Sequence, residues 1–310
     1  RLLAGAHGIT LERRFRAGRE DRLWTIGNVH PESRPSNPPL GGGPAHVTWD
    51  TLVPMSVSCV ERTFWWDVAR PAHAVIDPLR AVIFDLDGAL ADVERDAHRV
   101  AFNAAFAEHG LDISWSVAEY GRLVRIADEQ RRVASALRRR GYGRVSNEIA
   151  AHVYRTKTDL FETSVLDGDV SPRDGLADLA AGLFGAGVAV AVVSTGSRSW
   201  VEPLVRQLLG DGIAETIVTP DDLPRPTREP DLHGHALWEL GLGPESALAV
   251  AGGARGFRAA RAAKLATLVV TTGYSAGHEF PGAVQVRAEY DGLLAAGCER
   301  LHKNWWSAQG

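Results

Sequence analysis

From residue 81 onward, short apolar runs alternate with helical or turn-rich segments. The runs are Ala81–Phe84, Val188–Val193, Thr216–Val218, Ala247–Val250 and Thr267–Val270. Short runs of nearly continuous Val, Ile and Ala are typical of strands that helices cover on both faces. The pattern therefore predicts an α/β fold built on a doubly wound parallel sheet.

Residues 94–166, between the first two runs, carry helical periodicity throughout. The expected apolar stripes are Val100, Ala104, Phe106 and Ala107 in the first helix, and Leu123, Ile126, Val133 and Leu137 in later ones. An all-helical insert directly after the first strand predicts a cap domain over the strand ends, where open α/β sheets bind ligands. We therefore predict a core of residues 79–94 and 167–290, a helical cap of residues 95–166, and a C-terminal tail of residues 291–310.

Residues 1–78 differ from the rest and form an N-terminal extension. They hold four of the nine tryptophans and a Pro/Gly-rich stretch from Pro31 to Pro44. Repeated prolines with Gly41-Gly42-Gly43 can sustain neither a helix nor a central strand, so this stretch is predicted to be a loop or linker.

Composition and charge narrow the classes of partner. The chain has 310 residues and a net charge of −4, which provides no basic field for a nucleic-acid backbone. Its longest apolar stretch, around Val188–Val193, is too short to cross a membrane, and residues 1–20 lack a signal-peptide core. Two cysteines far apart, Cys59 and Cys298, predict neither disulfides nor a zinc site. We expect a cytoplasmic protein, or a plastid stromal one if the source is a eukaryote.

The first apolar run leads straight into Asp85-Leu86-Asp87-Gly88, which puts two carboxylates on a tight turn at the sheet's carboxyl edge. Asp-Gly after a strand is also a common turn signal, so the turn alone leaves the chemistry open. With the runs 94–103 and 272–280, the motif resembles the haloacid dehalogenase (HAD) superfamily of phosphotransferases. The likeness spans residues 80–290 and is strongest to the branch of β-phosphoglucomutases and CbbY-type sugar-bisphosphate phosphatases.

The resemblance implies roles for residues at the strand ends. Asp85 matches the nucleophile that forms an aspartyl-phosphate, and Asp87 matches the acid that protonates the leaving oxygen and then activates water. Both also match Mg²⁺ ligands of the family. Thr195, with Ser194 as the near alternative and Gly196 beside them, matches the motif that binds the phosphoryl oxygens, although a Ser/Thr/Gly run is also ordinary loop chemistry.

The third motif departs from the family pattern, because Thr227 stands where the resemblance implies a lysine. Arg228 or Arg225 is a candidate replacement, and we name Arg228 as a phosphate-binding residue. An arginine fork is longer and planar, so it does not simply replace a lysine ammonium. Without that lysine, Asp85, Asp87 and a phosphate crowd like charges, at roughly 4 kcal/mol per pair for a 4 Å separation and an effective dielectric of 20.

The fourth motif departs as well. Ala251-Gly252-Gly253 keeps the surrounding frame but carries no carboxylate. Mg²⁺ prefers six oxygens and would keep only Asp85, the Asp87 carbonyl, water and substrate. We therefore expect Mg²⁺ binding to be weak at best.

In the cap, Glu129 stands where the phosphatases of this branch carry a lysine, an exchange that would repel a sugar phosphate. His98, Arg99 and Arg131 match positions that could face the substrate, although helical residues of these types are equally often solvated or packed.

Three hypotheses follow. The first is a catalytically impaired HAD-fold protein, a pseudoenzyme retained for binding a ligand or partner. The second is a working Mg²⁺-dependent phosphatase of small phosphorylated metabolites, with Arg228 or Arg225 replacing the lysine and Asp221 or Asp222 drawn toward the cation. The third is an interaction protein, or a homo-oligomer, that acts through its Trp-rich extension and the tail pair Trp305-Trp306.

Overall fold

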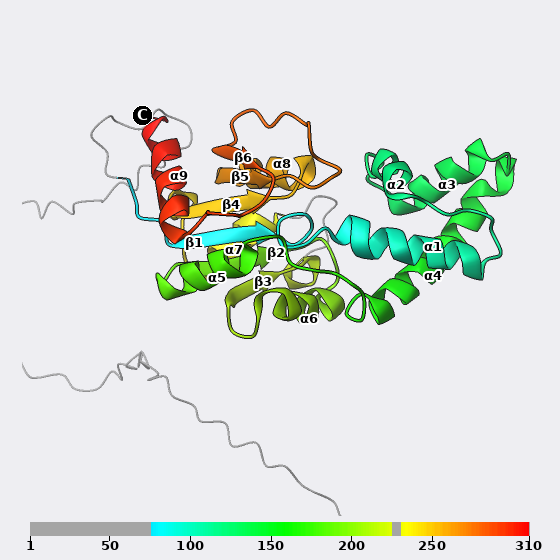
Figure 1. The fold of residues 1–310 in the computed structure, drawn as a ribbon, viewed down its shortest axis with the longest axis horizontal. Coiled ribbons are helices and arrows are strands. Elements are labelled where there is room, and N and C mark those ends of the chain that lie inside the picture. The colour runs from blue at the N-terminus through cyan, green and yellow to red at the C-terminus, as the bar shows by residue number, and fades with distance from the viewer. Residues whose placement is uncertain (1–75, 225–230, 310) are drawn as a thin grey trace, which may run out of the picture. The chain divides into compact units, whose positions relative to one another are not determined.

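The computed structural model describes residues 76–224 and 231–309 (Figure 1). The predictions for the N-terminal extension up to residue 75 lie outside these residues. So do the predictions for Thr227, Arg225 and Arg228.

The core is a six-stranded sheet of order β3-β2-β1-β4-β5-β6 in which every neighbouring pair is parallel. The strands are β1 (Ala81–Asp85), β2 (Ala189–Val193), β3 (Ala214–Val218), β4 (Ala247–Ala251), β5 (Ala266–Val270) and β6 (Gln285–Arg287). The prediction of a parallel α/β sheet is thus confirmed. The short edge strand β6 was not predicted, because its exposed Gln-Val-Arg sequence carries no apolar run.

The strand order reverses at β1, which pairs with β2 on one side and β4 on the other. Phe84 lies opposite both Val192 and Val250 in these two ladders. Such a reversal opens a crevice beyond the carboxyl ends of the strands, where open α/β sheets bind ligands. Asp85, the last residue of β1, lies at the mouth of that crevice.

Helices cover both faces of the sheet (Figure 1). On one face, α5 (Leu176–Gly185), α6 (Arg198–Leu209) and α9 (Ala295–Ser307) pack against Val82 and Phe84. On the other, α7 (Leu232–Leu240) and α8 (Ala254–Ala262) pack against Ala81 and Ile83. The tail predicted over residues 291–310 thus contains a helix that adds Cys298 to the core. None of the helices in the described ranges is long and apolar enough to cross a membrane.

The inserted segment is helical. After a π-helical turn (Glu94–His98), it contains α1 (Arg99–Glu108), α2 (Val117–Leu123), α3 (Glu129–Arg139) and α4 (Ser146–Ser164). These helices share their own apolar cluster, centred on Phe102, Phe106, Trp115, Tyr120 and Leu137. A capping box of Ser116 and Glu119 starts α2, and the Asp128 side chain caps α3. The boundaries given above for core and cap remain predictions.

The apolar stripe predicted for the first of these helices was wrong except at Phe106, which is buried. Val100 is 49% exposed, and the buried face instead consists of Ala101, Phe102, Ala105 and Phe106. The two phenylalanines decide the face, because their ring centroids lie 5.1 Å and 4.7 Å from that of Trp115. A large aromatic anchor buries far more area than Val100 or an alanine.

Candidate active site

Asp85 and Asp87 stand on the turn that follows β1. The Leu86 N–H donates to the Val193 carbonyl at 2.9 Å, and the Gly88 N–H donates to Ala91 at 2.6 Å. Gly88 has a φ of +82°, a conformation that residues with a Cβ rarely adopt. The geometry of the turn therefore requires the glycine of the Asp-x-Asp-Gly sequence.

The Asp85 carboxylate lies against the first turn of α8. A Cβ added to Gly256 would overlap Asp85 Oδ2, so only glycine fits at this position. The side chain of Asp85 is 17% exposed. Burial raises the pKa of Asp85 to about 7, and the neighbouring positive charge of Arg255 only partly opposes this shift. Asp85 is therefore harder to ionise than an ordinary aspartate.

Asp87 points toward the start of the inserted segment, where its Oδ1 accepts the Glu94 N–H at 3.1 Å. Although the residue keeps access to solvent, nearby protein atoms displace water from its carboxyl. This desolvation, with the carboxylates of Glu94 and Asp92, raises the pKa of Asp87 well above its ordinary range. A carboxyl with a raised pKa holds its proton more tightly, which suits a proton donor.

The Ser194-Thr195-Gly196 run follows β2, directly beside β1 in the sheet. The Ser194 hydroxyl accepts the Gly196 N–H at 3.1 Å, and the Thr195 side chain is exposed. Trp200 of α6 packs over this turn so closely that a Cβ on Gly196 would overlap its ring. The run thus lies at the same sheet edge as Asp85, and its predicted phosphoryl contacts remain a prediction.

His233 was missed in the sequence and lies beside Asp85. It occupies the first turn of α7, which the Asp231 side chain caps by accepting the Gly234 N–H at 2.8 Å. His233 is 2% exposed, and its Nε2 lies 3.9 Å from Asp85 Oδ1. Burial lowers the pKa of His233 to about 4, so the ring is neutral at physiological pH. The only sequence signal for this position of His233 is Asp231, a residue type that favours the N-cap of a helix.

The residues after β4 do not fit a magnesium ion. Ala251, Gly252 and Gly253 offer no carboxylate, and a Cβ on Gly252 would lie 2.7 Å from the Asp87 carbonyl oxygen and overlap the Gly88 main chain. The backbone of the Asp-x-Asp-Gly turn therefore fills the space that an acidic side chain would need. Within the described ranges, no group of three or more His, Cys, Asp or Glu residues could hold a metal.

Asp221 and Asp222, considered above as replacement ligands, are engaged at the start of α6. Asp222 Oδ2 accepts from Arg198 Nη2 at 2.7 Å and from the Thr219 N–H at 2.8 Å. Asp221 Oδ2 accepts the Arg198 N–H at 2.8 Å. Both carboxylates therefore cap and pair with α6 in this structure.

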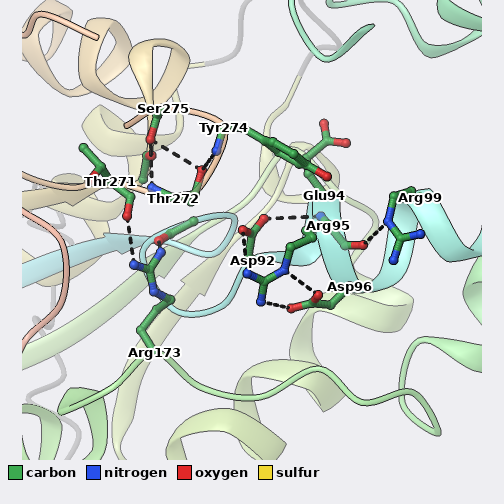
Figure 2. Close-up of polar contacts among 12 residues, drawn as sticks. Asp92, Glu94, Arg95, Asp96, Arg99, Arg173, Thr271, Thr272, Tyr274 and Ser275 are labelled. Carbon is green, nitrogen blue, oxygen red and sulfur yellow. Dashed lines mark hydrogen bonds and ion pairs between the residues drawn. The ribbon is translucent and has the colours of Figure 1, made fainter. Parts of the chain in front are cut away.

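Arg173 ties the Asp-x-Asp-Gly turn to the loop after β5 (Figure 2). Its guanidinium donates to the Gly88 carbonyl at 3.0 Å and the Thr271 carbonyl at 2.8 Å, and pairs with Glu289 at 2.7 Å. Ser275 adds a second link by donating to the Gly252 carbonyl at 2.7 Å. Loops that follow β1, β4 and β5 are thus joined by buried hydrogen bonds.

In the inserted segment, the predicted substrate-facing residues lie in different environments. Arg131 is 78% exposed and pairs loosely with Asp128, while Arg99 donates to the Arg95 and Trp115 carbonyls. His98 is largely buried and stacks on Phe161 with the ring centroids 4.1 Å apart. The structure does not bring these three side chains together with Asp85.

Glu129 has a partner that the sequence did not reveal. Lys157 of α4 is 3% exposed, and its Nζ lies 2.7 Å from both Glu129 Oε2 and His98 Nδ1. The negative charge predicted to repel a sugar phosphate is therefore balanced by a buried lysine. A second buried pair, Arg132 with Glu94 at 3.0 Å, lies in the same segment.

Comparison with known proteins identifies the family. A haloacid dehalogenase-like hydrolase family model matches residues 79–264. Protein CbbY of Cereibacter sphaeroides is 36% identical over 208 residues, covering 66% of this chain and 90% of that protein. A CBBY-like protein of Arabidopsis thaliana is 32% identical over 212 residues, covering 66% of each.

A solved structure is similar as well. The crystal structure of a CbbY variant from Rhodobacter sphaeroides in complex with xylulose-(1,5)bisphosphate is 32% identical, with a TM-score of 0.58. The match covers 71% of this chain and 99% of that one. The chain therefore belongs to the haloacid dehalogenase-like hydrolases, in the branch of the CbbY-type sugar-phosphate phosphatases.

Proposed function

We propose that this protein binds the phosphoryl group of a small sugar phosphate at Asp85 and has lost efficient magnesium-dependent hydrolysis. The observation that carries the proposal is the close approach of Gly252 to the Asp-x-Asp-Gly turn, which leaves no room for a metal-binding side chain. Asp85 itself remains at the mouth of the crevice, and Ser194 directly follows the neighbouring strand β2. Binding of phosphate is thus supported, whereas metal-assisted attack lacks its usual ligands.

The class of ligand follows from the family and from a relative. A CbbY variant has been crystallised with xylulose-(1,5)bisphosphate, and the chain matches 99% of that structure's length. The inserted segment here replaces one lysine with Glu129 but pairs it with Lys157. A small sugar mono- or bisphosphate is therefore the ligand class we propose, in a reducing compartment that suits the buried free thiol of Cys298.

A second candidate function is hydrolysis itself, through an Asp85 aspartyl-phosphate. It is favoured by the raised pKa of Asp87, which gives the turn a carboxylic acid able to donate a proton. It is opposed by the raised pKa of Asp85, because a protonated carboxyl is a poor nucleophile.

The deciding test is phosphate release from p-nitrophenyl phosphate and a panel of sugar mono- and bisphosphates, with and without Mg²⁺, beside Asp85→Asn. We expect that the wild-type protein shows no turnover dependent on Asp85. We also expect saturable binding of at least one sugar phosphate by calorimetry. Magnesium-dependent turnover that disappears in Asp85→Asn would establish the second candidate instead. Absence of both turnover and binding would refute both candidates.

A further inference from the structure

His233 presents an unused polar atom to the candidate active site. Its side chain is 2% exposed, and Nε2 has no hydrogen-bond partner among the residues that the structure describes. Buried polar atoms are nearly always bonded, so an unbonded one at a crevice indicates a missing ligand. The 3.9 Å separation from Asp85 Oδ1 is too long for a hydrogen bond and leaves Nε2 available to an atom beside the carboxylate.

Arg255 supplies a positive charge to the same place. It lies in the first turn of α8, next to Gly256, where an added Cβ would overlap the Asp85 carboxylate. Its positive charge lies close enough to Asp85 to interact with that carboxyl. The opening N–H groups of α8, which lack partners within the helix, add positive potential on the same side.

Together, His233 and Arg255 take the place of the lysine and the metal ion that the family resemblance implies at this site. The loop after β4 offers no carboxylate for a metal, but the residue three positions beyond Gly252 is an arginine. A metal at this site would need acids to hold it, whereas a guanidinium needs none and can bind two phosphoryl oxygens at once.

We propose that His233 and Arg255 form an oxyanion-binding pair at Asp85 that holds a phosphoryl group without a divalent cation. This rests on the proposed function, because it assumes that the Asp85 crevice receives a phosphate. In the bound state Nε2–H of the neutral His233 ring donates to one phosphoryl oxygen and the Arg255 guanidinium donates to others. No bond to phosphorus forms or breaks in this binding step.

The test uses inorganic phosphate as the probe and the full-length protein, titrated by isothermal calorimetry in EDTA and again with excess MgCl₂. We expect saturable binding in EDTA that Mg²⁺ does not strengthen. Arg255→Ala should weaken it about tenfold, because it removes a charge-assisted contact. His233→Phe, which keeps a ring but removes both nitrogens, should weaken it several-fold, and His233→Gln, which can place a donor near the Nε2 position, should recover part of the loss.

Matched controls lie on the same two helices. Arg258→Ala removes an exposed arginine one turn further along α8, and His235→Phe removes a histidine that pairs with Glu239 at 3.3 Å on α7. Both should bind phosphate as the wild-type protein does. Thermal melting and circular dichroism on every variant show whether it is folded, and the partial recovery in His233→Gln separates loss of a donor from loss of packing.

The outcomes are distinguishable. Binding that requires Mg²⁺ would overturn the metal-independent pair while leaving the proposed phosphate site intact. Binding in EDTA that is equally insensitive to Arg255→Ala and His233→Phe would place the anion elsewhere and overturn the assignment. No binding of phosphate or of any sugar phosphate under either condition would overturn the proposed function, and the pair with it.

Discussion

Gly252 lies so close to Gly88 that a Cβ on Gly88 would come within 2.8 Å of the Gly252 Cα. The two glycines belong to the loops after β4 and β1. Close packing of these main chains joins the two loops directly and leaves no space for a side chain at position 252.

This contact predicts the effect of restoring an acid. Gly252→Asp should lower the free energy of unfolding by about 2 kcal/mol, because its Cβ would overlap backbone atoms that cannot move freely. It should not create a magnesium site detectable by calorimetry. Urea unfolding checks the first expectation.

The neighbouring position provides the control for that variant. Gly253→Asp adds the same charge at the N-cap of α8, where a Cβ would meet only Ser275 Cβ at 3.8 Å. It should cost less than about 0.5 kcal/mol, since aspartate is a favourable N-cap. Tight Mg²⁺ binding by Gly252→Asp at undiminished stability would show that the loops separate more easily than their packing implies.

Arg173 should be a main stabiliser of the Asp-x-Asp-Gly turn. Its side chain is 9% exposed and donates to carbonyls in three separate segments, including Gly88 and Thr271. Arg173→Met should lower the free energy of unfolding by about 3 kcal/mol, because those buried acceptors lose their donor. Arg173→Lys should recover little, since an ammonium cannot reproduce the fork.

Urea unfolding of Arg173→Met beside Glu289→Gln is the measurement. Glu289 is 35% exposed, so neutralising it should cost about 1 kcal/mol or less. Equal losses in the two variants would mean that the ion pair, rather than the backbone contacts, carries the stabilisation.

Lys157 should be more sensitive to substitution than any exposed charge of the inserted segment. Lys157→Met leaves the Glu129 carboxylate without its cation and should cost about 3 kcal/mol of unfolding free energy. The double variant Lys157→Met/Glu129→Gln should regain at least about 1 kcal/mol, because it removes the unpaired charge.

Arg131→Ala, at a 78% exposed position, should change stability by less than about 0.5 kcal/mol in the same denaturation series. A double variant no more stable than Lys157→Met would refute the ion-pair explanation.

Stability should fall on mild acidification because of His98. Burial, reinforced by the positive charge of Lys157, lowers the pKa of His98 from 6.5 to about 4. Between these values the unfolded chain binds a proton that the folded protein excludes, so acid favours unfolding. His98 alone should remove roughly 2 kcal/mol between pH 7 and pH 5, with no further loss from this group below its folded pKa.

The pH prediction is checked by urea unfolding of the wild-type protein and His98→Phe at several pH values. The phenylalanine keeps the stack on Phe161 and cannot titrate. The difference between the two proteins in unfolding free energy should therefore change by roughly 2 kcal/mol across this range. Parallel curves for the two proteins would assign the pH dependence to other groups.

Much of the fold could be predicted from local sequence. The apolar runs that begin at Ala81 and Ala247 correctly predicted β1 and β4, because strands buried on both faces require continuous apolar residues. The sequence Asp85-Leu86-Asp87-Gly88 also predicted the turn after β1, since glycine readily adopts the positive φ found at Gly88. The exposed edge strand β6 and the buried face of α1 were not predicted, because burial there depends on neighbours distant in sequence, such as Trp115.

By itself, the sequence determined that the carboxylates of Asp85 and Asp87 end a central strand and that acids are missing after β4. The tertiary structure decided what surrounds them. His233 lies 148 positions from Asp85 in sequence (233 − 85), and their 3.9 Å separation exists only because α7 is capped at Asp231 and packs against the sheet. Similarly, Lys157 balances Glu129 only because α3 and α4 pack side by side. Pairings of charges and donors across helices arise from packing, which no local pattern encodes.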